Sequence, residues 1–452
     1  MATRVTPIKD MPRVTTLGGD PYITQAALLL AALVDGHVTL RKPNRSIDTD
    51  RTVAFLESVG IRLNRTDSAI EISGRNNILL PDDSTLIFDG SVFPLTMVMG
   101  LLAGRNESCF INYSKSINQD IIDTIINTLN ANGIDILHEA DERLIVIRKG
   151  TEYPIEIKIS SSLSYLKNCI LMSGIASGRS VLVRELISGP NFFEKCVGKF
   201  RGKLTIDKPG MEVREDPRDP RRKIRTSGVD HRREISLPSS IRLHSADIEI
   251  PNDSDAISAL MTLAVLKKHN VRLENIPLSS ARLRLLNYLK SSGIDSHISD
   301  RRLIDGEHIG TVELEGKGFR VRKTSGEQAA ELIEDIPFLA VLAASGSGTS
   351  VIRGVAEFGQ WGIEPFEEIA ENLSRMGAKC GILEDGLIIE GTGKLTGADF
   401  GTIRNPKVGL AFFLAALTAE GWSGFGNFEI IEKNYPDIVR IMRQNSVYGV
   451  TN

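Results

Sequence analysis

The chain has 452 residues, of which 41% are hydrophobic and 25% charged, so it is long enough for two or more domains with apolar cores. Its formal net charge of −3 excludes a protein whose whole surface attracts nucleic acid or anionic membranes, because such a surface needs a surplus of lysine and arginine. Four widely spaced cysteines without a CxxC pair, and seven histidines without metal-ligand spacing, predict neither a disulfide framework nor a metal site.

The first predicted helix follows a glycine pair and an acid, in the stretch GGDPYITQAALLL at residues 18–30. Proline favours the first helical position, so the helix is expected to begin at Pro21. The amides at a helix N-terminus commonly bind phosphate or carboxylate groups. Lysine or serine would suit such a site, but Pro21 and Tyr22 occupy these positions. The stretch therefore has the scaffold of an anion site without its charges.

The same pattern recurs along the chain as an apolar helix, a turn with glycine, a β-branched strand and an amphipathic helix. The six predicted units begin with the segments 23–42, 94–113, 164–186, 255–276, 336–355 and 408–430. A helix that is apolar all round is expected to be buried on every side, and a striped helix on one face only. Units of about 70 to 80 residues are too long for a nearest-neighbour solenoid, so three units per globular domain are predicted.

A stretch rich in proline, arginine and aspartate interrupts the third unit at about residues 199–240. Two interpretations of this stretch stay open. It is either a solvated excursion of mixed charge or a basic flap near an anionic ligand.

Motifs spread over nearly the whole chain resemble, in their order and spacing, those of the enolpyruvyl transferase family. They are GGD before the first helix, DTDRTVAFLESVGI, SSSLSYL, ISGP, PNDSDAISAL, EDIPFLAVLAA and KNYPD. The resemblance is strongest to the members that act on shikimate 3-phosphate. It implies an α/β (α+β) fold, a two-domain inside-out α/β barrel built from six βαβαββ repeats, three per domain. The implied domains are residues 22–252, and residues 1–21 together with 253–452.

The resemblance implies transfer of the enolpyruvyl group of phosphoenolpyruvate to a hydroxyl group, with release of phosphate. Such a cleft needs lysine and arginine for two anionic substrates, an acid for the methylene carbon and a base for the hydroxyl. The implied catalytic residues are Asp335, Glu364 and Lys433, with Asp335 of EDIP as the base. The alternative for Asp335 is a cap at the start of the following helix. The residues implied to bind substrate are Asp20, Tyr22, Ser162, Ser164, Ser188, Arg404 and Lys407.

Several positions that are cationic in the family carry other residues here. Pro21 and Phe93 replace a lysine and an arginine, and Glu367 reverses the charge of an arginine. Lys407 replaces an arginine, whereas Lys433 is retained. Each lost charge-assisted contact to a buried anion costs on the order of 1.5 to 3 kcal/mol. We therefore expect a divergent enzyme that is not an efficient synthase on shikimate 3-phosphate.

Three functions follow from these residues, and the transferase ranks first on the resemblance. The first is enolpyruvyl transfer to a shikimate-like or other cyclic acceptor in secondary metabolism. The second is elimination of water or phosphate from a shikimate-type ring without phosphoenolpyruvate, which a neutral cleft around Tyr22, Phe93 and Trp361 would favour. The third is a non-catalytic binding or assembly protein with the same fold.

The expected partners are small molecules, namely phosphoenolpyruvate and a cyclic polyol acid, or the latter alone. We expect no cofactor, no metal, no nucleic acid and a monomeric protein. No apolar run approaches the roughly 20 residues that span a bilayer, and the first residues lack the apolar core of a signal peptide. The expected location is the cytoplasm.

Overall fold

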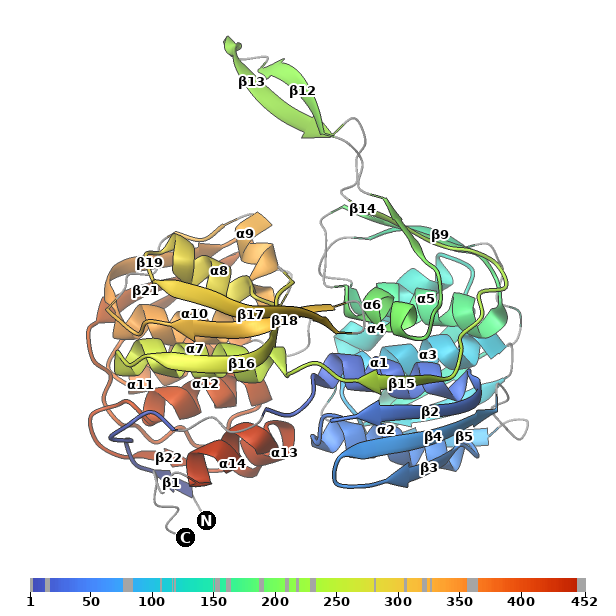
Figure 1. Ribbon diagram of the computed structural model, residues 1–452, viewed down its shortest axis with the longest axis horizontal. Coiled ribbons are helices and arrows are strands. Elements are labelled where there is room, and N and C mark those ends of the chain that lie inside the picture. The colour runs from blue at the N-terminus through green and yellow to red at the C-terminus, as the bar shows by residue number, and fades with distance from the viewer. Residues whose placement is uncertain are drawn as a thin grey trace. The chain divides into compact units, whose positions relative to one another are not determined.

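The computed structural model divides into two compact units. Unit 1 consists of Met1–Thr24, Arg41–Asp50 and Glu249–Asn452, and unit 2 of Gln25–Leu40 and Arg51–Ile248. The structure describes residues 3–12, 17–75, 84–105, 108–115, 117, 119–148, 150, 155–159, 164–186, 191–207, 211–216, 219–227, 233–279, 282–304, 307–318, 323–325, 327–355 and 365–444. Helices and sheets occur in both units, so the predicted α/β class is confirmed (Figure 1).

Most strands of unit 2 lie in four-stranded sheets (Figure 1). One sheet has the order β15 (Ala246–Glu249), β2 (Asp35–Arg41), β4 (Ala69–Arg75), β3 (Arg62–Arg65). Another has the order β5 (Ser84–Phe88), β6 (Cys109–Tyr113), β8 (Leu144–Ile147), β7 (Ile136–Glu139). A further sheet has the order β11 (Thr205–Asp207), β14 (Arg233–Leu237), β10 (Val181–Glu185), β9 (Ile155–Ile159). In this last sheet β9 and β10 are parallel and β14 is antiparallel to β10.

The apolar segments of this part of the chain form buried helices, as predicted. They are α1 (Pro21–Ala32), α3 (Val92–Arg105) and α5 (Ser164–Ser177). The amphipathic segments form α2 (Ile47–Ser58), α4 (Gln119–Asn130) and α6 (Phe192–Lys199). The apolar face of α4 shows why the stripe forms a helix, because its isoleucines recur at helical spacing and are buried.

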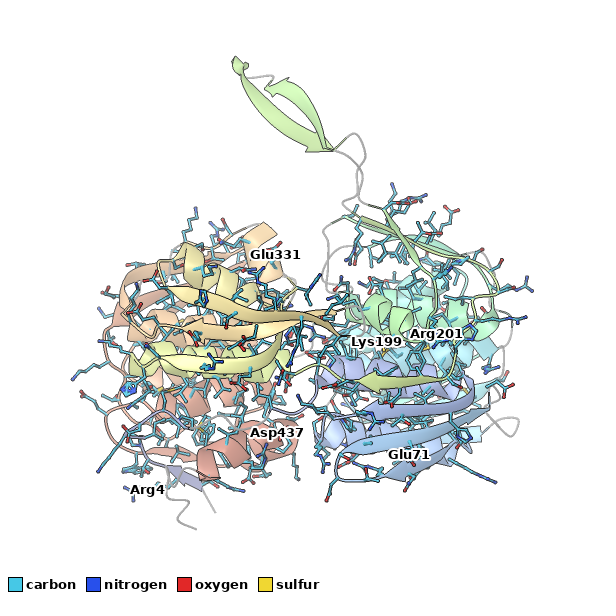
Figure 2. The ribbon with its side chains drawn as sticks, viewed as in Figure 1. Arg4, Glu71, Lys199, Arg201, Glu331 and Asp437 are labelled. Carbon is cyan, nitrogen blue, oxygen red and sulfur yellow. The ribbon has the colours of Figure 1, made fainter. Side chains whose placement is uncertain are left out.

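The predicted interruption at residues 199–240 is wrong at its C-terminal end. Strand β14 belongs to the sheet of the third unit and pairs with β10 from Val181↔Leu237 to Glu185↔Arg233. The inserted part is a two-stranded hairpin of β12 (Met211–Asp216) and β13 (Asp219–Ser227). Lys199 ends α6, and Arg201 follows it closely (Figure 2). The side chains of 208–232 lie outside the described residues, so the choice between a solvated excursion and a basic flap stays a prediction.

Unit 1 contains smaller sheets. Their orders are β16 (Val271–Pro277), β18 (Glu307–Leu314), β17 (Ser296–Ile304); then β19 (Ser347–Arg353), β21 (Gly386–Thr392), β20 (Lys379–Leu383); and then β1 (Thr3–Val5), β22 (Ser423–Phe425). The buried helices are α7 (Ser254–Lys267), α10 (Ile336–Ser345) and α12 (Pro406–Ala416). Their partners are α8 (Arg284–Ser291), α9 (Glu327–Glu331), the 3-10 helix η3 (Ile333–Asp335), α11 (Pro365–Arg375), α13 (Glu429–Asn434) and α14 (Pro436–Gln444).

Helices α7, α10 and α12 pack against one another in the core of unit 1. Almost every residue of α10 and α12 is buried, which agrees with their apolar sequences. The six predicted apolar helices are therefore confirmed as helices, while their origin as copies of one repeat and the boundary at residue 252 stay predictions. Within the described ranges, no helix combines the length and apolarity needed to cross a membrane.

Candidate functional site

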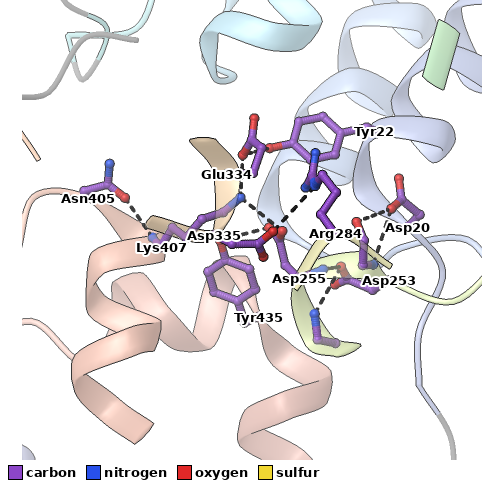
Figure 3. A network of polar contacts seen from close by, with 12 residues as sticks. Asp20, Tyr22, Asp253, Asp255, Arg284, Glu334, Asp335, Asn405, Lys407 and Tyr435 are labelled. Atoms are coloured by element: carbon purple, nitrogen blue, oxygen red, sulfur yellow. Dashed lines mark hydrogen bonds and ion pairs between the residues drawn. The ribbon is translucent and has the colours of Figure 1, made fainter. Parts of the chain in front are cut away.

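Polar side chains gather in unit 1 where α1, α7, α10 and α12 begin (Figure 3). They come from six segments that are far apart in sequence. We call them the polar network, which consists of Asp20, Tyr22, Asp253, Asp255, Arg284, Glu334, Asp335, Asn405, Lys407 and Tyr435. Because the N-terminal end of a helix carries partial positive charge, helix starts that meet in this way favour negatively charged groups.

Lys407 occupies the middle of the polar network. The side chain of Asn405 caps α12 and accepts the Lys407 amide at 2.8 Å, and Pro406 takes the first helical position, so the first turn of α12 is well defined. The Lys407 Nζ donates to Glu334 Oε2 at 2.6 Å and to Asp255 Oδ1 at 3.0 Å. Burial opposes the charge, but these two carboxylates outweigh it and hold the pKa of Lys407 well above its usual value. Lys407 is therefore a fully charged cation at neutral pH.

Glu334 Oε2 accepts a second hydrogen bond, from the Tyr22 hydroxyl at 3.3 Å. The Lys407 Nζ also lies 6.0 Å from the centre of the Tyr22 ring. Burial acts to raise the pKa of Glu334, but Lys407 and Arg284 outweigh burial and lower it below its usual value. One carboxylate oxygen thus takes both a lysine and a tyrosine donor.

Asp335 lies next to Glu334 in sequence but in a different environment. Its side chain is 2% exposed, and neither carboxylate oxygen has a hydrogen-bond partner among the described residues. The Arg284 Nε lies 3.5 Å from Asp335 Oδ2. Asp335 stands at the N-cap position of α10, yet its side chain makes no capping hydrogen bond. The capping alternative is therefore wrong, and among the described residues the carboxylate is held by its attraction to Arg284.

Asp20 is fully buried and holds the start of α1. Its Oδ1 accepts the Ile23 amide at 3.0 Å, which satisfies one N-terminal amide of the helix. Its Oδ2 accepts from the Ser254 hydroxyl at 3.0 Å and forms an ion pair with Arg282. The chain thus places a carboxylate of its own at the start of α1, where the sequence predicted an anion scaffold.

The start of α7 carries two further acids. Asp253 caps the helix through the Asp255 amide at 2.8 Å, and its pKa is raised well above the usual value by burial and by the nearby charges of Asp255 and Asp20. Burial also raises the pKa of Asp255, against the attraction of Lys407. Tyr435 donates to Asp255 Oδ2 at 3.5 Å, and burial together with Asp255 raises its pKa well above the usual value. Burial thus disfavours the charged form of both acids, whereas the contact with Lys407 favours the charged form of Asp255.

The structure brings together four of the residues that the sequence predicted for the site. These are Asp20, Tyr22, Asp335 and Lys407. Arg404 is exposed and pairs with Glu368, its Nε lying 3.8 Å from Glu368 Oε1, and Lys433 is exposed on α13, so neither joins the polar network.

The remaining predicted residues lie elsewhere. Ser162, Ser188, Glu364 and Trp361 lie outside the described residues. Ser164 begins α5 in unit 2, and its side chain is likewise outside them. Phe93, also in unit 2, is buried with its ring 5.7 Å from that of Tyr165.

Six of the ten residues of the polar network were not predicted for the site. They are Asp253, Asp255, Arg284, Glu334, Asn405 and Tyr435. A signal did exist, because each is a polar residue in or beside a segment predicted to be buried, and buried charges need partners.

A second buried network lies in unit 2. Lys167 of α5 contacts Glu194 of α6 at 2.9 Å and Glu185 of β10 at 3.1 Å, and Arg233 of β14 pairs with both glutamates. All four side chains are at most 6% exposed. This network joins the ends of elements that flank Ser162 and Ser188 in sequence, and its two cations match its two acids.

The polar network can bind and orient polar groups and can accept a proton at Asp335. Among the described residues, no group of three or more histidines, cysteines, aspartates or glutamates is arranged as a metal site. The chemistry available is therefore that of carboxylates, tyrosine hydroxyls and the two cations Arg284 and Lys407.

Comparison with known proteins identifies the family. Residues 5–442 match the family model of EPSP synthase (3-phosphoshikimate 1-carboxyvinyltransferase). The 3-phosphoshikimate 1-carboxyvinyltransferase of Alkaliphilus oremlandii is 23% identical over 432 residues, covering 95% of this chain and 96% of that protein. That of Synechocystis sp. is 25% identical over 432 residues, covering 94% and 92%.

Two solved structures have the same fold. EPSP synthase from Acinetobacter baumannii superimposes with a TM-score of 0.77 at 18% identity, covering 100% of both chains. The enolpyruvyl transferase NikO from Streptomyces tendae superimposes with a TM-score of 0.66 at 13% identity, covering 100% of this chain and 99% of that one.

Proposed function

Because the chain belongs to the EPSP synthase family of enolpyruvyl transferases, we propose that it transfers the enolpyruvyl group of phosphoenolpyruvate to a hydroxyl of a shikimate-like or other cyclic acceptor. The observation that carries this proposal is the state of Asp335. A buried carboxylate with no hydrogen-bond partner among the described residues costs free energy, so its retention calls for a role. Proton acceptance from a substrate hydroxyl supplies that role.

Arg284 supports Asp335 as a base. The guanidinium lies 3.5 Å from the carboxylate, and although burial opposes its charge, Asp335 and Glu334 raise its pKa above the usual value. A permanent cation at this distance attracts the carboxylate and holds it in place without forming a hydrogen bond to it. Both oxygens still have hydrogen-bonding capacity for a substrate hydroxyl.

The proposed reaction consists of an addition followed by an elimination. The acceptor oxygen loses its proton to Asp335 and bonds to the carbon of phosphoenolpyruvate that carries the phosphate, while the methylene carbon takes a proton. Loss of phosphate and of one methyl proton then restores the double bond. The products are an enolpyruvyl ether and inorganic phosphate. Positioning of the two substrates lowers much of the barrier, and the base contributes a further factor.

Other residues of the site stay proposals. We propose that Lys407 contacts the donor, and that Lys433, Glu364 and Arg404 complete its binding. Ser162, Ser164 and Ser188 are proposed to bind the acceptor. We also propose a monomeric, cytoplasmic enzyme with domains of residues 22–252 and of 1–21 plus 253–452.

Replacing the proposed base tests the assignment. Asp335→Asn keeps the shape of the side chain but removes proton acceptance, so turnover should fall by about 10²- to 10⁴-fold. The measurement is the rate of phosphate release with phosphoenolpyruvate and a cyclic acceptor, alongside the melting temperature. Asp385→Asn is the matched control, since Asp385 also pairs with an arginine, Arg353, but at the surface. Full activity in Asp335→Asn would remove Asp335 from the base role.

A further inference from the structure

The contacts of Glu334 suggest a role that the proposed reaction does not include. Its Oε2 lies 2.6 Å from the Lys407 Nζ and 3.3 Å from the Tyr22 hydroxyl. A lysine ammonium and a tyrosine hydroxyl converging on one oxygen form the arrangement that binds a phosphate or carboxylate oxygen of a ligand. In this chain the oxygen belongs to the protein.

We propose that Glu334 is a specificity-determining residue, whose carboxylate occupies the place of an anionic substrate oxygen between Lys407 and Tyr22 and weakens the binding of anions there. This inference rests on the proposed function, because it concerns how that site accepts an anionic donor. A donor oxyanion reaches these two groups only when Glu334 moves away, so the donor competes with a group that is always present at the site.

The surroundings of Lys407 strengthen the competition. Asp255 takes a second contact with the same Nζ at 3.0 Å, so two carboxylates face one ammonium. The side chains of Lys407, Asp255 and Glu334 are 12%, 5% and 9% exposed, so solvent screens their attraction little. The two carboxylates already neutralise the charge of Lys407, so an incoming anion is attracted less strongly.

The buried Asp335 provides an independent indication that a ligand binds beside this contact. Both of its oxygens are buried without hydrogen-bond partners among the described residues, and Arg284 lies near both Asp335 and Glu334. A polar ligand that donates to Asp335 would therefore lie next to Glu334. Glu334 then selects among such ligands by the negative charge that they carry.

The test is the affinity of the purified full chain for inorganic phosphate and for phosphoenolpyruvate, measured by calorimetry at pH 7.5 without an acceptor. Glu334→Gln keeps the size of the side chain and removes its charge, so both anions should bind at least about tenfold more tightly, the effect expected when one charged contact is released. Glu420→Gln is the matched control, because Glu420 also lies 2.6 Å from a lysine Nζ, that of Lys394, but at the surface.

A second variant and a double variant complete the test. Asp255→Asn, which removes the other carboxylate on Lys407, should also tighten anion binding, and it serves if Glu334→Gln fails to fold. The gain should vanish in the double variant with Lys407→Met. Unchanged or weaker binding in the folded variants, an equal gain in Glu420→Gln, or a gain that survives loss of Lys407 would each overturn the proposal. Since no turnover is measured, failure here is separate from failure of the transferase assignment.

Discussion

The adjacent acids Glu334 and Asp335 show how position determines the chemistry of a carboxylate. Glu334 is bonded to Lys407 and Tyr22, and its pKa is lowered. Asp335 has only an arginine at 3.5 Å and no hydrogen-bond partner among the described residues. One acid is thus committed to internal contacts, whereas the other keeps its capacity to accept a proton. A single residue step along η3 separates the two environments.

Asp253 allows a test by pH at the residue scale. Burial and the charges of Asp255 and Asp20 raise its pKa in the folded state, so the fold holds this proton more tightly than the unfolded chain does. The stability that the proton contributes is complete below the unfolded pKa of about 3.9 and is lost as the pH rises through the raised folded value. Asp253→Asn keeps the helix cap and has no proton to lose.

We therefore expect the melting temperature of Asp253→Asn to equal that of the unmodified protein near pH 3.5 and to exceed it increasingly toward pH 8. Scanning calorimetry of both proteins across this range measures the difference. A constant difference at every pH would show that Asp253 has an ordinary pKa in the folded state.

The sequence predicted Asp335 and Lys407 as site residues because both lie in recognisable motifs. It did not predict their contacts. The partners of Lys407 are 73 and 152 residues away along the chain, and no local pattern encodes such distances. Lys433 also lies in a motif that suggested a site residue. The structure places it at the surface, outside the polar network.

At the scale of elements, small residues control how closely the buried helices of unit 2 approach. A Cβ atom on Gly100 of α3 would overlap the carbonyl oxygen of Cys169 in α5, and one on Gly104 would overlap that of Ser173. The four-residue spacing places both glycines on one face of α3. The two helix backbones therefore touch where these glycines lie.

Gly100→Ala should destabilise the protein by about 1 to 3 kcal/mol, because a backbone oxygen cannot move aside as a flexible side chain can. Gly198→Ala in α6 is the matched control, since its Cβ would meet nothing within 4 Å. That control should be neutral or stabilising by up to about 1 kcal/mol, because alanine favours helix more than glycine does. Thermal unfolding measures the stability of both variants. Equal stability of the two would contradict close packing at Gly100.

The buried helices were predictable because their signal is local, a long apolar run that ends at glycine. Strand β14 was missed because its first residue, Arg233, resembles the charged stretch before it. Arg233 is buried and its charge is paired with Glu185 and Glu194, which come from other elements. A charged residue next to a predicted strand does not show that the segment is exposed, because an ion pair allows the charge to be buried.

At the scale of the whole molecule, the chain keeps the fold of its family over its full length. The family model covers residues 5–442, and the superposition on an EPSP synthase covers the entire chain. In unit 1 the helix starts are occupied by the chain's own acids, Asp20, Asp253 and Glu334 among them. Fold alone does not determine activity, so the reaction needs a direct assay.

The decisive assay for enolpyruvyl transfer is phosphate release with shikimate 3-phosphate or unphosphorylated shikimate as the acceptor. It is run with and without phosphoenolpyruvate, and the products are identified by mass spectrometry. If the chain transfers an enolpyruvyl group, phosphate release will require phosphoenolpyruvate, and the product will be heavier than the acceptor by one enolpyruvyl group. Release from shikimate 3-phosphate without phosphoenolpyruvate, and without that mass gain, would contradict enolpyruvyl transfer and indicate elimination instead.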